Sequence, residues 1–210
     1  MFDIDGTLYD YEYCNKIAER ELYAAVQREF DIEEECIKEL LKSAKKKTKE
    51  QLGNVAASHN RLLYMQKICE MAGRSPLLYA KAFYDVYWDT FLEAMKLYEY
   101  VLPLFRELKE RDIKIGLLTD LTAHIQYRKM EKLGLADYID YLTTSEEVGA
   151  EKPDKAMFGN ILSKAGCTPD ETLMIGDSLE RDIHGAQENG MKAIRYQEGL
   201  DIYKKVIGIL

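Results

Sequence analysis

Two aspartates near the start of the chain are the residues best placed to do chemistry. Asp3 and Asp5 lie in the segment MFDIDGTL, residues 1–8, whose first four residues read as the end of a buried strand. Residues two apart in an extended backbone point to the same side, so both carboxylates face the same space. At about 5 Å and an effective dielectric of about 20, their repulsion is roughly 3 kcal/mol. Such a pair normally shares a proton or binds a cation, and the alternative is a solvated acidic turn.

Other polar residues follow later segments that have the pattern of buried strands. These segments are 113–118, 138–144 and 172–175, and the polar residues that follow them are Thr119 and Asp120, Lys152, and Asp177 and Asp182, respectively. Taken singly, each is a weak signal, because such residues usually cap helices or form turns. In an open parallel sheet, however, ligands bind where the carboxyl ends of the strands meet a crevice. We therefore expect these side chains to meet Asp3 and Asp5 in one site.

The elements that must position these residues follow two patterns. Residues 13–98 show only helical periodicity, which predicts four helices, the third beginning at the N-cap Ser58 and ending at Gly73. From residue 99 onwards, strands alternate with helices of about 12 residues, and the last strand is expected at 192–196. This alternation predicts an α/β fold with a parallel sheet covered on both faces. The core is thus expected to combine residues 1–12 and 99–210, with the helical insert after the first strand.

The composition narrows the function classes. The 210 residues are 47% hydrophobic, enough for a substantial core, and the net charge of −8 argues against binding a nucleic-acid polymer. The cysteines are scattered without paired spacing and are expected to be reduced core residues: Cys14, Cys36, Cys69 and Cys167. No apolar run approaches 18 residues and no leader pattern precedes the aspartates, so we expect a soluble, cytoplasmic protein without membrane association.

The polar residues, in their order along the chain, resemble the motifs of the haloacid dehalogenase (HAD) superfamily, and the resemblance covers the whole chain. The matching residues are Asp3-Ile-Asp5-Gly-Thr-Leu, the Thr119 hydroxyl, Lys152 in Glu-Lys-Pro, and Gly176-Asp177-Ser-Leu-Glu-Arg-Asp182. The resemblance implies a HAD-like, Rossmann-like core with the small helical cap of subfamily I. Segment 176–186 is also similar to the branch that contains pyrimidine nucleotidases and N-acylneuraminate-9-phosphate phosphatase.

These residue types fit the hydrolysis of phosphate esters. Because such an ester is an anion, a carboxylate can attack it only where the negative charge is neutralised. Asp3 is expected to be the nucleophile that forms an aspartyl-phosphate, and Asp5 the general acid and base. The expected phosphate-binding residues are Thr119, Asp120 and Lys152. Asp3 and Asp177 are expected to bind Mg²⁺, and the resemblance adds the Asp5 carbonyl as a third ligand. Asp182 either supports the water shell of the metal or bonds to its own helix.

The helical insert is expected to select the substrate. Arg61 follows His59 and Asn60 at the start of the third helix, where free N–H groups favour an anion. We therefore take Arg61 as a candidate substrate contact, with an exposed polar turn as the alternative. His124 and His184 follow other motifs closely but are expected to lie on helix surfaces.

The first strand departs from expectation in its length. Only two residues precede Asp3, whereas strands average about five or six residues. We therefore expect several apolar residues before Phe2 in the natural protein. Asp120, where the family often has Asn or Gly, adds a negative charge near the site.

The expected activity is hydrolysis of small phosphomonoesters, either sugar phosphates or nucleoside monophosphates, by a monomer or homodimer. A carbon–halogen hydrolase on the same fold is one alternative, but it would lack the second aspartate, so Asp5 argues against it. A phosphomutase would need a long-lived phosphoenzyme and a cap suited to rotating a bisphosphate. A catalytically silent binding module is the third alternative, although all the expected catalytic residues are present.

Overall fold

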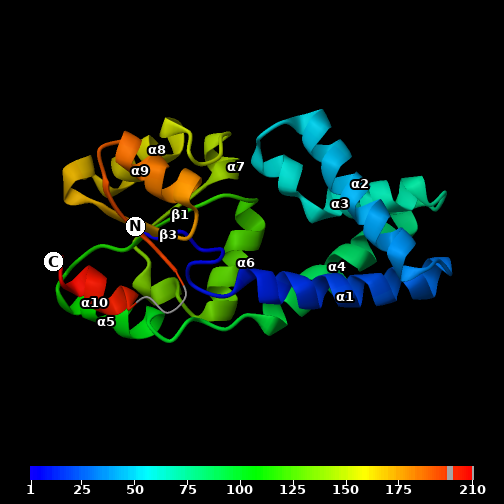
Figure 1. Cartoon of the computed structure of the whole chain (residues 1–210), viewed down its shortest axis with the longest axis horizontal. Helices are drawn as coiled ribbons and strands as arrows, with labels where there is room; N and C mark the ends of the chain where they lie inside the picture. Colours follow the sequence, from blue (N-terminus) through cyan, green and yellow to red (C-terminus); the bar gives the residue numbers. More distant parts are fainter. Residues whose placement is uncertain (198–200, 210) are drawn as a thin grey trace. The chain divides into compact units, whose positions relative to one another are not determined.

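The computed structural model describes residues 1–197 and 201–209, and it divides into two compact units (Figure 1). One unit combines Met1–Tyr11 with Lys96–Leu210, and the other is Glu12–Met95. Within the described residues, none of the helices has both the length and the apolar character needed to cross a membrane.

The first unit is built on parallel strands. These are β1 (Gly116–Thr119), β2 (Tyr141–Thr144), β3 (Leu173–Gly176) and β4 (Lys192–Arg195). β1 pairs with β2 and β3 pairs with β4, both in parallel. The two pairs are joined by Phe2, which bridges Leu117 on one side and Ile175 on the other. The order across the sheet is therefore β2, β1, Phe2, β3, β4, and the predicted α/β fold with a parallel sheet is confirmed.

The ladder at Phe2 explains where Asp3 emerges. The Phe2 amide donates to the Gly116 carbonyl at 2.8 Å, and the Leu118 amide donates to the Phe2 carbonyl at 2.9 Å. On the other side, the Asp3 amide donates to the Ile175 carbonyl at 2.9 Å. Because Asp3 directly follows this central pairing, its side chain lies at the carboxyl ends of β1 and β3.

Helices cover both faces of the sheet, as the buried, largely apolar strands require. On one face lie α8 (Lys155–Ala165) and α9 (Gly185–Glu188), whose residues Phe158, Ile161 and Ala186 pack with Leu118 and Met174 in one buried cluster (Figure 1). On the other face lie α5 (Val101–Glu110) and α10 (Ile202–Ile207). α5 is amphipathic, and its Phe105 ring lies 4.9 Å from the Phe2 ring.

Further elements connect these layers. They are α6 (Ala123–Leu133), η2 (Ala136–Tyr138), α7 (Ser145–Val148), η3 (Pro169–Glu171) and the π-helical turn η4 (Leu179–His184). α6, α7 and η4 follow the carboxyl ends of β1, β2 and β3, whereas η2 and η3 directly precede β2 and β3. α6 ends at Gly134, whose φ of 65° is the left-handed conformation that glycine adopts most easily. α6 and η4 carry side chains toward the site described below.

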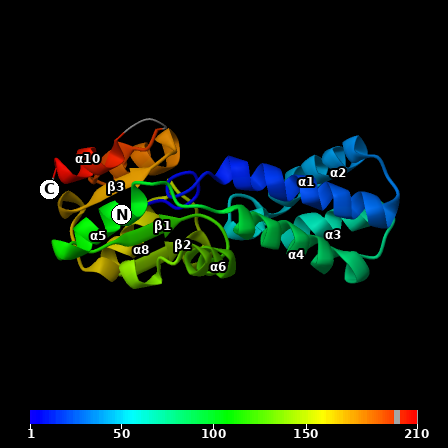
Figure 2. The ribbon, with the colours of Figure 1, turned by 90° about the horizontal axis from the view of Figure 1, so that it is seen from below.

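The second unit is helical, with α1 (Tyr11–Phe30), α2 (Glu34–Leu52), η1 (Ala56–His59), α3 (Arg61–Met71) and α4 (Pro76–Ala94). α3 packs against both α2 and α4 (Figure 2). The four expected helices are present, but the third does not begin at Ser58. Its N-cap is Asn60, whose side chain accepts a hydrogen bond from the Leu62 amide at 2.9 Å. Ser58 lies in the preceding 3₁₀ turn instead.

Candidate active site at the carboxyl ends of the strands

Lys152 lies at the centre of the predicted site. Its ammonium donates to Oδ1 of Asp3 at 2.6 Å and to Oδ1 of Asp182 at 2.7 Å. A third hydrogen bond, at 3.0 Å, goes to the Leu118 carbonyl at the end of β1. All three charged residues are buried. A buried cation between two buried carboxylates offsets the cost of removing each charge from water.

Asp177 joins Asp3 and Asp182 in an acidic cluster. One carboxylate oxygen from each residue lies within 4.8 Å of the others. Two glycines leave room for these side chains. A Cβ added at Gly6 would lie 2.6 Å from Oδ2 of Asp177, and one added at Gly176 would lie 2.4 Å from Asp182. Converging carboxylate oxygens in space kept open by glycine fit a hard cation such as Mg²⁺.

Asp5 faces a different set of partners from Asp3. Its carboxylate oxygens lie 2.6 and 2.8 Å from Nζ of Lys129. The Tyr9 hydroxyl donates to Oδ1 of Asp5, and the Gln126 amide makes a long contact of 3.4 Å with Oδ2. The side chains of Asp3 and Asp5 are therefore held by separate cations, although only one residue lies between them.

Thr119 and Asp120 form the rim of the same site. The Thr119 hydroxyl donates to the Asp120 carbonyl at 3.1 Å and accepts from the Gln126 amide at 2.7 Å. The Asp120 carboxylate accepts from the backbone amide of Lys152 at 2.9 Å and lies 3.5 Å from the Arg181 guanidinium. The extra negative charge of Asp120 is thus directed at a backbone donor and an arginine.

Burial governs the protonation of these groups, and nearby charges modify it. Burial raises the pKa of Asp3; Lys152 opposes the rise, whereas repulsion from Asp182 and Asp5 adds to it. Burial would also raise the pKa of Asp5, but Lys129, Tyr9 and Gln126 together lower it below its ordinary value. The pKa values of two carboxyl groups two residues apart are therefore shifted in opposite directions by their different surroundings.

Burial likewise raises the pKa of Asp177, and repulsion from Asp182 adds to the rise. The pKa of Asp120 is also raised, mainly by burial. Burial alone would lower the pKa of Lys152, but attraction to Asp3, Asp182 and Asp120 raises it, so the ammonium stays charged. Because burial makes these carboxyl groups harder to ionise, a bound cation would stabilise their charged form.

The residues that sequence reasoning missed are Lys129 and Gln126, both on α6. They lie on the buried side of this helix together with Ile125 and Met130. A lysine and a glutamine at core-facing positions of an amphipathic helix were the available signal. Such residues are rarely buried without a partner, so their position in the helix pattern could have pointed to the site.

Arg61 lies in the helical unit at the start of α3. Its Nη1 donates to the His59 carbonyl at 2.9 Å, and its guanidinium lies 5.4 to 5.7 Å from the ring centroids of Tyr64, Tyr87 and Trp88. This buried arginine thus packs among aromatic rings of its own unit. Its role as a substrate contact stays a prediction.

The two histidines beside the motifs lie where they were expected. His124 is exposed on α6, and His184 is exposed at the end of η4, 3.3 Å from the Glu180 carboxylate. Both histidines thus lie on helix surfaces, as expected.

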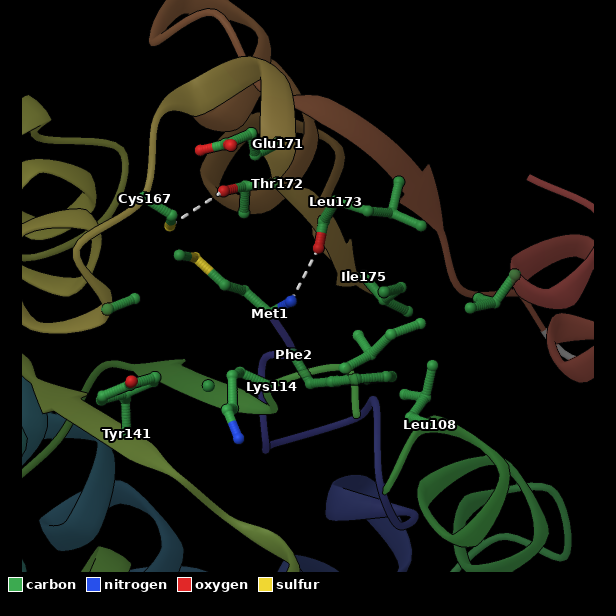
Figure 3. A pocket seen from close by; sticks show the side chains of 14 residues that line it. Met1, Phe2, Leu108, Lys114, Tyr141, Cys167, Glu171, Thr172, Leu173 and Ile175 are labelled. Atoms are coloured by element: carbon green, nitrogen blue, oxygen red, sulfur yellow. Dashed lines mark hydrogen bonds between the residues drawn. The ribbon is translucent and has the colours of Figure 1, made fainter. Parts of the chain in front are cut away.

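A separate apolar pocket of about 200 Å³ lies at the opposite ends of the strands (Figure 3). Its lining includes Gly116, Tyr141 and Leu173, the first residues of three strands, together with Met1 and Phe2. The Met1 amino group donates to the Leu173 carbonyl at 2.7 Å. Since none of the predicted site residues lines this pocket, the candidate active site is the polar cluster at the carboxyl ends.

Comparison with known proteins agrees with this geometry. Residues 1–196 match the family described as haloacid dehalogenase-like hydrolase. A ribulose-1,5-bisphosphate 5-phosphatase of Halopiger xanaduensis is 37% identical over 93% of this chain and 83% of its own length. N-acylneuraminate-9-phosphatase of Rattus norvegicus is 28% identical over 92% of this chain and 79% of its own length, which confirms the expected likeness to that branch.

A solved structure extends the comparison to the fold. A HAD-hydrolase of Bacillus subtilis, crystallised with bound magnesium, superposes with a TM-score of 0.71. It is 21% identical and covers 96% of this chain and 89% of its own. With the matching motifs, the parallel core and the helical insert all in place, the chain belongs to the haloacid dehalogenase-like hydrolase family.

Proposed function

We propose that the protein is a Mg²⁺-dependent phosphatase that hydrolyses small phosphomonoesters through an aspartyl-phosphate intermediate. The observation that carries the proposal is the separation of Asp3 and Asp5 into two environments. Asp3 lies with Lys152 and the acidic cluster, where an anionic ester and a cation can meet. Asp5 lies beside it with its own cation, Lys129, and its own hydrogen-bond donors.

The residues divide the reaction into two displacements at phosphorus. In the first, an oxygen of Asp3 bonds to phosphorus and the bond to the leaving oxygen breaks. The electron pair stays on that oxygen, which takes a proton from Asp5. In the second, water attacks the phosphorus, Asp5 takes a proton from it, and the bond to Asp3 breaks. Inorganic phosphate leaves and both carboxyl groups return to their starting state.

Lys152 and Thr119 bind the phosphoryl oxygens as charge spreads over them, and the backbone near Asp120 completes the rim. Asp182 holds the Lys152 ammonium at 2.7 Å and so orients it toward the ester. Asp3 and Asp177, with the backbone carbonyl of Asp5, would hold Mg²⁺. When bound, the ion neutralises the charge that would otherwise repel the ester dianion from the carboxylates.

Sugar phosphates are the first substrates to test, because the relatives named above act on a sugar bisphosphate and on an acylneuraminate phosphate. Nucleoside monophosphates come second. We further propose that residues 13–98 act as a cap that selects the leaving group, with Arg61 as its candidate contact. A cytoplasmic monomer or homodimer without nucleic-acid or membrane partners fits this substrate class.

The test is phosphate release by the purified full chain with Mg²⁺, measured on p-nitrophenyl phosphate, a panel of sugar phosphates and nucleoside monophosphates. Asp3→Asn serves as the control for contaminating phosphatases. We expect turnover of the aryl ester and of at least one sugar phosphate. Halide release from a 2-haloacid would support the dehalogenase alternative, and transfer of phosphate within a sugar phosphate would support a mutase. Binding without turnover of any ester would support a silent module.

A further inference from the structure

Lys129 is a buried cation that the general phosphatase mechanism does not use. Its side chain is 0% exposed, and it reaches the site from the middle of α6. Burying an ammonium is costly, and the cost is offset only where the partner geometry is good. Here the partner is the Asp5 carboxylate, which Lys129 contacts through both oxygens, at 2.6 and 2.8 Å.

The contacts around Lys129 define the orientation of the Asp5 side chain. The Tyr9 hydroxyl donates to Oδ1, the oxygen that Lys129 contacts at the shorter distance. The Lys129 ammonium also lies 5.9 Å from the centroid of the Tyr9 ring, within range of a cation–π contact. Asp5 is thus held by donors from α6 and from the segment after the first strand, whereas Asp3 is held by Lys152.

α6 links this support to the phosphate rim. Gln126, one turn before Lys129, donates to the Thr119 hydroxyl and to the Asp120 carbonyl, both at 2.7 Å. One helix face therefore contacts the rim through Gln126 and the Asp5 carboxylate through Lys129. A shift of α6 would move both groups together.

We propose that Lys129 is a positioning residue that fixes the Asp5 carboxyl in the orientation from which it exchanges protons with the leaving oxygen and the attacking water. The inference rests on the proposed function, since it assigns to Lys129 a role that acts through Asp5. In the first displacement the leaving oxygen takes its proton from Asp5 as the bond to phosphorus breaks. In the second, Asp5 takes a proton from the attacking water. Lys129 exchanges no proton in either step.

The first test uses the different proton demands of two leaving groups. An alkyl phosphate needs a proton on its leaving oxygen, whereas the p-nitrophenolate of p-nitrophenyl phosphate leaves without one. Lys129→Met should lower kcat/KM for a sugar phosphate by about 10- to 100-fold, as expected for a displaced acid group, and lower kcat/KM for the aryl ester much less. With the aryl ester, phosphoenzyme should accumulate, because the second displacement still needs Asp5.

Lys129→Arg keeps the charge and the donors, so it should recover part of the alkyl-phosphate activity. Lys109→Met is the control, because it also removes a lysine from an ion pair. Its partner is Asp140, at 2.9 Å; this pair is half-buried and lies at the amino end of β2 instead of the carboxyl ends of the strands. Lys109→Met should leave the ratio of the two kcat/KM values unchanged. Circular dichroism and thermal unfolding of each variant verify that the folded enzyme is being compared.

A double-mutant cycle separates positioning from a merely structural role. If Lys129 acts through Asp5, Lys129→Met should change the activity of Asp5→Asn by less than about twofold, because the group it positions is already inactive. The inference would be overturned if Lys129→Met lowered kcat/KM equally for both esters and by the same factor in the Asp5→Asn background. Failure of the proposed function looks different: the wild type would form no phosphoenzyme, and Asp5→Asn would not discriminate between the esters.

Discussion

Nζ of Lys152 lies 2.6 Å from Oδ1 of Asp3, although 149 residues separate the two in the chain. The contact forms because Asp3 follows the central pairing of the sheet and the same ammonium reaches the Leu118 carbonyl at the end of β1. The nucleophile of the proposed reaction is therefore already beside the cation that would receive the phosphoryl oxygens. Asp182, on the other side of that ammonium, prevents Lys152 from pairing with Asp3 alone.

Substitutions of Asp3 and of Asp5 should impair different steps of the reaction. Asp3→Asn removes the nucleophile, so no phosphoenzyme should form from any ester. Asp5→Asn keeps the nucleophile and removes the proton carrier, so turnover should fall by about 10²- to 10⁴-fold while a phosphoenzyme from an activated ester persists. Intact-protein mass spectrometry after rapid acid quenching measures the phosphorylated fraction. Equal accumulation in the two variants would refute the assignment of roles.

Gly6 and Gly176 should not tolerate a side chain, because an added Cβ would collide with carboxylates of the site. Gly6→Ala would place a methyl group 2.6 Å from the Asp177 carboxylate, at a φ of 85° that alanine rarely adopts. Gly176→Ala would place one 2.4 Å from Asp182. Both should lower kcat by at least about tenfold by displacing carboxylates of the site.

Gly159→Ala is the matched control for these two variants, because nothing lies within 4 Å of its added Cβ and its position is inside α8. It should leave kcat unchanged and raise the free energy of unfolding by up to about 1 kcal/mol. Wild-type kcat in Gly6→Ala or Gly176→Ala would show that the acidic cluster tolerates displacement.

Asp140 should make the stability of the core depend on pH. Burial would raise its pKa, but the Ile115 amide at 2.8 Å and the Lys109 ammonium at 2.9 Å outweigh burial and lower it. A carboxylate whose pKa is lowered by folding stabilises the fold above its unfolded pKa, about 4, and loses that contribution as pH falls through the folded value.

We therefore expect Asp140→Asn to lower the free energy of unfolding by about 1–2 kcal/mol at pH 7. The difference from wild type should shrink once the pH falls below about 4. Denaturant titrations at several pH values measure it. Asp112→Asn, which removes an exposed partner of Lys114, is the control and should change stability by less than about 0.5 kcal/mol. A pH-independent loss in Asp140→Asn would contradict the electrostatic account.

Removal of divalent cations should abolish phosphate release. Asp3, Asp177 and Asp182 present three carboxylate oxygens within 4.8 Å of one another, and together they would repel an ester dianion. We expect EDTA to stop turnover of p-nitrophenyl phosphate and added Mg²⁺ to restore it. Full turnover in the presence of the chelator would remove the basis for the metal-assisted mechanism.

Substrate size offers a test of the proposed cap. If residues 13–98 close over the site, they leave room for a small leaving group and not for a folded polypeptide. We expect catalytic efficiency on the best sugar phosphate to exceed that on a phosphoserine within a folded protein by at least about 10³-fold. Comparable efficiencies, measured by phosphate release under the same conditions, would mean that the insert does not restrict access.

The sequence determined the fold class and the placement of polar residues at one edge of the sheet. Buried, largely apolar strand segments followed by polar residues specify a parallel sheet with its polar residues at one edge, and helical periodicity in residues 13–98 specifies a helical insert. These are local patterns, so they can be read from neighbours along the chain. The wrong start predicted for the third helix has the same origin, because it too was inferred from local sequence. Ser58 and Asn60 are both good N-caps, and only the packing of the turn selected Asn60.

The tertiary structure alone decided which lysine forms an ion pair with which aspartate. Asp3 and Asp5 are nearly equivalent in the sequence, yet Lys152 pairs with one and Lys129 with the other. Both lysines are distant in sequence, and an isolated lysine in a helix pattern normally indicates a solvated face. Only the packing of α6 brings the buried Lys129 ammonium against the Asp5 carboxylate. Burial and charge then shift the two aspartates in opposite directions, which no spacing rule could predict.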